Sequence, residues 1–95
     1  MSNVAGTESG TFATGETTKV ISLRAHKVPL TLVISYASLS TQKVELSAGG
    51  GTEYFEPPYA SSTATQKVVT VGAPISHVKF TGVAGNTWRI NSGDR

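Results

Sequence analysis

The chain has few of the side chains on which cofactor chemistry depends. It contains no cysteine, which excludes a disulfide framework and a thiolate metal site, and its two histidines, His26 and His77, lie in separate segments. Charged residues make up 15% of the sequence, and the formal net charge is +2. The basic residues are scattered along the chain. So dispersed a charge does not form the basic patch that nucleic-acid binding requires. We therefore expect no cofactor, no metal and no nucleic-acid partner.

Long apolar runs are also missing. No segment reaches the ~20 apolar residues that a membrane-spanning helix needs, and the first residues lack the basic and apolar regions of a signal peptide. We therefore expect no membrane partner, and a protein that stays in the cytosol or is assembled there into something larger.

Helical periodicity is absent, and apolar residues instead alternate with polar ones in short segments separated by turn-forming residues. This pattern predicts an all-β fold, either an antiparallel β-sandwich or a jelly-roll-like barrel, of about seven short strands. The expected strands are residues 20–25, 30–36, 42–48, 52–57 and 66–71, with two more within residues 75–91.

The clearest local pattern is in residues 75–91. Val78 and Phe80 alternate with polar residues, the segment GVAGN turns the chain, and Trp88 and Ile90 alternate again, which predicts a β-hairpin whose apolar face belongs to the core. The opposite face is expected to be one polar, mildly basic strip, in which Lys79 and Arg89 are candidate partner contacts. That strip consists of His77, Lys79, Thr81, Thr87 and Arg89.

Residues 1–18 contain few apolar side chains among Gly, Ser, Thr and Glu. Such a segment cannot bury enough surface alone to offset its ordering entropy. We therefore expect an extended polar N-terminal arm at 1–18 and a β-sandwich domain at 19–95. The arm would order on a neighbouring subunit, with Val4 and Phe12 as anchors, by adding a strand to the neighbour's edge.

No residue pattern predicts catalysis, so we expect a protein that is not an enzyme. Glu53 and Glu56 are expected at a solvated strand edge, and His26 and His77 are expected at the surface. No serine lies in a Gly-x-Ser-x-Gly elbow, and the triple glycine 49–51 lacks the Lys-Ser/Thr and the helix of a phosphate-binding loop.

Two groups of residues suggest contacts with other molecules. Tyr54, Phe55 and Tyr59 are close in sequence and are either a ring platform for a sugar or partly core. Apolar residues also occur on both faces of several strands, which predicts a second apolar surface and therefore a homo-oligomer or docking to a partner. Those residues are Val20, Val33, Val68 and the adjacent pair Tyr54 and Phe55.

The segments KVELSAGGGTEYFEP and ISHVKFTGVAGNTWRI resemble the strand, glycine-rich turn and closing hairpin of small β-sandwich proteins in tailed-bacteriophage virions. That group includes capsid decoration proteins and head or tail accessory proteins. The resemblance implies a structural role in a virion assembled in the host cytoplasm, with the major capsid protein or other virion proteins as partners. A tail, neck or head-fibre accessory protein and a small carbohydrate-binding β-sandwich module are the alternatives.

Overall fold

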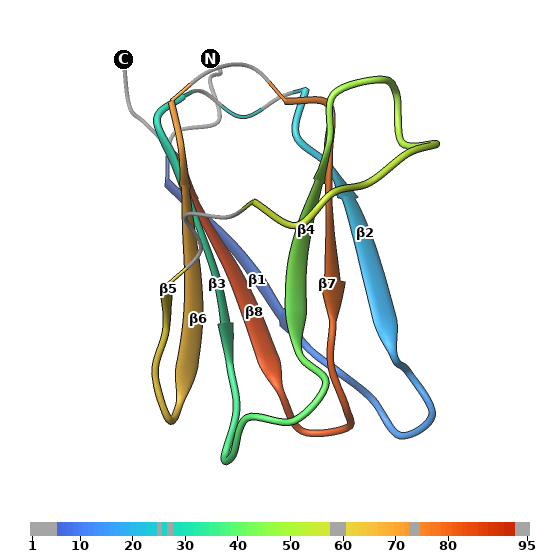
Figure 1. Ribbon diagram of the computed structural model, residues 1–95, viewed down its shortest axis with the longest axis vertical. Helices are drawn as coiled ribbons and strands as arrows, with labels where there is room; N and C mark the ends of the chain where they lie inside the picture. Colours follow the sequence, from blue (N-terminus) through green and yellow to red (C-terminus); the bar gives the residue numbers. More distant parts are fainter. Residues whose placement is uncertain (1–5, 25, 27, 58–60, 73–74, 93–95) are drawn as a thin grey trace.

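The computed structural model describes residues 6–24, 26, 28–57, 61–72 and 75–92, and it confirms the predicted all-β, sandwich-like fold. Eight strands in this part of the chain form two antiparallel sheets, with the orders β1-β8-β3-β6-β5 and β2-β7-β4 (Figure 1). No helix long and apolar enough to span a bilayer occurs among these residues. The strands are β1 (Gly6–Thr11), β2 (Thr18–Ser22), β3 (Leu30–Ser35), β4 (Lys43–Ser47), β5 (Ser61–Ser62), β6 (Gln66–Val71), β7 (His77–Thr81) and β8 (Thr87–Ser92).

The core lies between the two sheets and follows the predicted alternation. Every second residue of β3 is buried and faces the buried residues of β4 and β7. Each fully buried Leu, Ile, Val or Phe contributes about 1.5–3 kcal/mol from removal of its apolar surface from water. The buried strand residues include Leu30, Leu32, Ile34, Val44, Leu46, Val69, Val78, Phe80, Trp88 and Ile90.

The predicted hairpin at 75–91 is wrong, although its two strands and their buried faces are right. β7 pairs with β2 and β4 in one sheet, whereas β8 pairs with β1 and β3 in the other, so the loop 82–86 carries the chain across the sandwich. Phe80 and Trp88 therefore stack across the core, with ring centroids 5.6 Å apart. The backbone groups of this loop bond to the segment after β1, where Gly85 N–H donates to Phe12 O at 2.9 Å.

The segment expected to be a separate arm is largely part of the sandwich. Residues 6–11 form β1, which pairs along its length with β8, and the side chain of Phe12 is 1% exposed within the core of its own chain. β1 has no apolar side chain, so backbone hydrogen bonds to β8 take the place of side-chain burial. Phe12 is thus not free to anchor on a neighbour, and Val4 lies outside the described residues.

Candidate functional site

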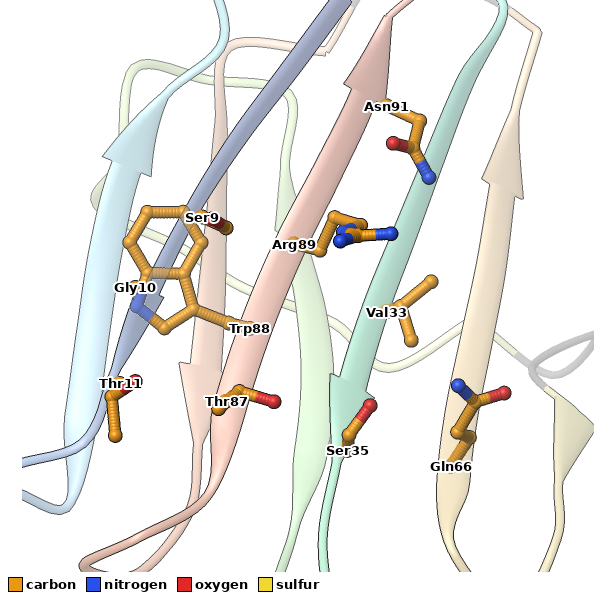
Figure 2. Close-up of a pocket in the computed structure, with 10 residues that line it drawn as sticks. All are labelled: Ser9, Gly10, Thr11, Val33, Ser35, Gln66, Thr87, Trp88, Arg89 and Asn91. Carbon is orange, nitrogen blue, oxygen red and sulfur yellow. The ribbon is translucent and has the colours of Figure 1, made fainter.

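A polar hollow lies on the outer face of the five-stranded sheet. Alternation in β1, β8, β3 and β6 turns every second side chain away from the core and onto this face. The hollow has a volume of about 590 Å³ and is open to solvent (Figure 2). Its outward-pointing hydroxyl and amide side chains are Ser9, Thr11, Ser35, Gln66, Thr87 and Asn91.

Arg89 lies in the middle of this hollow. The strand register places it between Ser9 on β1 and Val33 on β3, and Figure 2 shows its guanidinium group reaching toward β3. Arg89 forms no ion pair with any described residue, and no Asp or Glu is among the residues that line the hollow. Its positive charge is therefore uncompensated within the hollow and available to an anionic group.

The predicted basic strip does not exist as one surface. Lys79 is on the outer face of the three-stranded sheet, whereas Arg89 is on the outer face of the five-stranded sheet, because β7 and β8 belong to different layers. The ammonium group of Lys79 lies 4.7 Å from the centroid of the Tyr54 ring, a cation–π contact that occupies one face of the ring. Lys79 and Arg89 therefore cannot contact the same small partner surface.

Tyr54 and Phe55, the two described residues of the predicted ring platform for a sugar, do not form such a platform. Phe55 pairs with Leu46 of β4 through two backbone hydrogen bonds of 2.8 and 2.9 Å, and its side chain is 48% exposed. Its neighbour Tyr54 points to the other side of this extended segment and packs against Lys79. The two rings thus do not lie side by side, and Tyr59 lies outside the described residues.

The apolar residues predicted on the outer faces are also divided between two surfaces. Val20 is 50% exposed on the three-stranded sheet, whereas Val33 and Val68 are half-buried partners on the five-stranded sheet. They do not form one continuous apolar surface.

The sheet edges in the described part of the chain carry features that oppose strand addition. β5 has only two residues, and β4 is flanked by the segment 52–57. On β1 and β2 a charged residue occupies a core-facing position, Glu8 opposite Ile90 and Lys19 opposite Phe80. Very short edges, covering segments and inward charges are devices that prevent edge pairing. Contacts with partners are therefore better placed on the faces and loops than on the edges.

Four loops meet at one end of the sandwich and are hydrogen-bonded to one another. We call the residues 12–17, 36–42, 63–65 and 82–86 the loop end, which lies at the bottom of Figure 1. Buried Gln42 Nε2 donates to buried Asn86 Oδ1 at 3.0 Å, and this oxygen also accepts from Val83 N–H at 2.9 Å. The Tyr36 hydroxyl donates to Thr63 O at 2.9 Å. These bonds hold the loops in one arrangement.

Two large apolar side chains are exposed on this loop end. Leu39 is 47% exposed in the loop before β4, and Val83 is 44% exposed in the loop before β8. The hydrogen bond between Gln42 and Asn86 connects the two loops that carry them. Single exposed apolar side chains are common on protein surfaces, but two of them on loops that are held in one arrangement offer a preformed contact for another protein.

Sequence analysis missed a constellation of serine, histidine and glutamate at the opposite end. His26 Nε2 lies 2.8 Å from Glu8 Oε1, and His26 Nδ1 contacts Ser92 Oγ. The three residues are 18 and 66 positions apart in the chain, so no local spacing could have revealed them. The nearby hollow of about 370 Å³ is lined by His26 but not by Ser92.

Serine, histidine and a carboxylate in this order form the side-chain arrangement of a catalytic triad, but a triad must present its hydroxyl to a substrate. The His26 side chain is only 4% exposed, and both of its ring nitrogens are in contact with partners. What the arrangement does in this structure is tie β1 and β8 to the loop before β3. No group of His, Cys, Asp or Glu that could hold a metal ion occurs among the described residues.

No protein family, curated protein sequence or solved structure matches this chain. Its function must therefore be inferred from its own surfaces.

Proposed function

We propose that the protein is a non-enzymatic structural protein of a tailed-bacteriophage virion, which decorates and stabilises the capsid by binding the major capsid protein. The observation that carries this proposal is the well-held loop end with its exposed Leu39 and Val83. The all-β sandwich, and the segment KVELSAGGGTEYFEP with its resemblance to the strand and glycine-rich turn of virion proteins, support the same assignment.

The loop end suits a repetitive, weak contact. Leu39 and Val83 are each about half exposed, so covering the remaining surface of each would contribute roughly 1 kcal/mol. Each contact stabilises the shell only slightly, but the same contact at every symmetry-related position stabilises the whole shell. Because internal hydrogen bonds already hold the loops, binding costs little ordering entropy.

The first test is whether the protein is a component of the particle. Purified particles of the phage that encodes it should contain it in a copy number comparable to that of the major capsid protein, measured by quantitative mass spectrometry. Gold-labelled antibody and electron microscopy would then separate the capsid from a neck, tail or head-fibre position. Absence of the protein from purified particles would refute a virion role.

The second test concerns the loop end. The double variant Leu39→Ser, Val83→Ser should bind shells that lack the protein more weakly, by about 10-fold or more, as measured by co-sedimentation. Val20→Ser is the matched control, because Val20 is equally exposed but lies on the outer face of the three-stranded sheet. Equal occupancy by the double variant and the control would exclude the loop end as the contact.

A further inference from the structure

We propose that the hollow on the outer face of the five-stranded sheet is a binding site for an acidic oligosaccharide, with Arg89 as the group that binds a sugar carboxylate. This site is on a different surface from the loop end, and it uses none of the aromatic residues that the sequence suggested for sugar binding.

Charge selects an anionic ligand. Arg89 is exposed, forms no ion pair with a described residue, and is the one charged side chain among those that line the hollow. A guanidinium group presents two parallel N–H donors that match the two oxygens of a carboxylate. Neighbouring residues do not neutralise this charge, because Ser9 and Val33 flank Arg89 on the two adjacent strands.

The remaining side chains select a ligand rich in hydroxyl groups. The hydroxyls of Ser9, Ser35 and Thr87 can each donate and accept, and the amide of Gln66 offers both functions. Thr7 Oγ1 donates to Asn91 Oδ1 at 3.0 Å, which leaves the side-chain NH₂ group of Asn91 to donate to a ligand. A simple inorganic anion uses donors alone, whereas a sugar uses donors and acceptors together, so this surface suits a sugar that carries an acid group.

The shape of the site agrees with this chemistry. The volume of about 590 Å³ lies within the range of roughly 300–1,000 Å³ that is common for small-ligand sites. The site rests on strands of a sheet rather than on loops, so its groups are held in fixed register before a ligand arrives. Trp88 lines the hollow but is only 6% exposed, so its ring offers little surface for stacking and recognition depends on charge and hydrogen bonds.

The test is a titration with three acidic oligosaccharides in solution, in which NMR chemical shifts of the backbone amides report binding. The probes are trigalacturonate, a hyaluronan hexasaccharide and sialyllactose at millimolar concentration. Trigalacturonate methyl ester, which lacks the charge, and sodium acetate, which lacks the hydroxyls, are the controls. At least one acidic sugar should shift the amides of Arg89, Ser35 and Thr87, and neither control should reproduce its affinity.

Variants locate the binding on this face. Arg89→Gln should lower the affinity for the tightest-binding probe by about 10-fold to 100-fold, because it removes a charge-assisted hydrogen-bonded pair. The affinity of Arg89→Lys should lie between those of Arg89→Gln and the wild type, since lysine keeps the charge but lacks the paired donors. Lys79→Gln removes a positive charge from the opposite sheet and should leave binding unchanged.

Three results would overturn the proposal. They are the absence of shifts at Arg89 with every acidic probe, an unchanged affinity in Arg89→Gln, and equal binding of the methyl ester or acetate. A normal thermal transition for Arg89→Gln excludes misfolding as the cause of lost binding. None of these results depends on whether the protein binds a capsid.

Discussion

Substitution of Gly10 by alanine tests how closely β1 packs on the core. A Cβ atom at this position would lie 2.8 Å from the indole atoms Cε2, Cζ2 and Nε1 of Trp88, closer than carbon atoms approach without strain. The indole ring cannot easily move away, because Trp88 is 6% exposed and the ring of Phe80 is stacked against it in the core. Gly10→Ala must therefore displace either β1 or the ring.

The expected cost is that of overpacking a core, roughly 1–3 kcal/mol. Alanine normally stabilises a strand relative to glycine by about 0.5–1 kcal/mol. The measured loss of stability is therefore the strain from overpacking minus this gain. Each 1 kcal/mol lowers the midpoint of thermal unfolding by about 4–8 °C in a domain of this size. Gly10→Ala should therefore unfold between roughly 4 and 24 °C below the wild type.

Urea and thermal unfolding followed by circular dichroism would measure this change. Gly49→Ala is the matched control, because its Cβ meets nothing within 4 Å and its backbone does not have a positive φ. It should be neutral or more stable by up to about 1 kcal/mol.

A double-mutant cycle with Trp88→Phe identifies the cause of the loss. Phenylalanine lacks the indole atoms that the new methyl group would meet. Gly10→Ala should therefore reduce the free energy of unfolding by at least about 0.5 kcal/mol less in the Trp88→Phe background, because residues in contact show coupling energies of about 0.5 kcal/mol or more. If Gly10→Ala is as stable as Gly49→Ala, or if the cycle shows no coupling, β1 does not lie on Trp88 as described. Residues 6–11 would then behave as the separate arm that the sequence suggests.

Two further substitutions test the loop end and the turn before β2. Asn86→Ala leaves the amide of Gln42 and the N–H of Val83 without their acceptor, so it should cost about 1–3 kcal/mol in urea unfolding; a loss below 0.5 kcal/mol would contradict a role in holding the loops. The pKa of Glu16 is held below 4.5 by the Ala13 N–H and then by Lys19, so its stabilising effect is complete above pH 4.5 and disappears as the pH falls through the folded-state pKa. Glu16→Gln should therefore lose less stability than the wild type when acidified below pH 4.5, and parallel curves for the two proteins would refute this role.

Alternation with a period of two was enough to predict most of the strands and their buried faces. The alternation assigns four residues of 75–91 to the core, and all four are buried: Val78, Phe80, Trp88 and Ile90. Alternation is a local property, because successive residues of any strand point to opposite sides. It therefore indicates which face is buried without indicating which strands are neighbours.

Pairing between strands is the part that the sequence did not reveal. A turn such as GVAGN reverses the chain equally well within one sheet or between two sheets, so the crossing from β7 to β8 carries no local signal. β1 was missed for a different reason. Its sequence GTESGT has no apolar residue, and its place depends on backbone bonds to β8 and on the space that Gly10 leaves for Trp88.

The same crossing decides what the candidate sites could be. A hairpin would have put Lys79 and Arg89 on one basic surface. Because the chain crosses between the sheets, Arg89 instead lies among hydroxyl and amide groups, and Lys79 packs against the ring of Tyr54. The candidate sites therefore depend on a non-local pairing that the local sequence pattern does not reveal.

The loop end and the Arg89 hollow are adjacent but distinct, and this separation constrains both proposals. From the loop end upward, the outer face presents first the row of Thr11, Thr87 and Ser35 and then the row that contains Arg89. A shell bound at the loop end reaches the first row before the second, so it can leave Arg89 open to a sugar. Leu39→Ser with Val83→Ser should then weaken shell binding while sparing oligosaccharide binding, and Arg89→Gln should do the reverse. If each set of substitutions impaired both activities, the two surfaces would have to be one site, and a capsid contact over the whole face would replace both proposals.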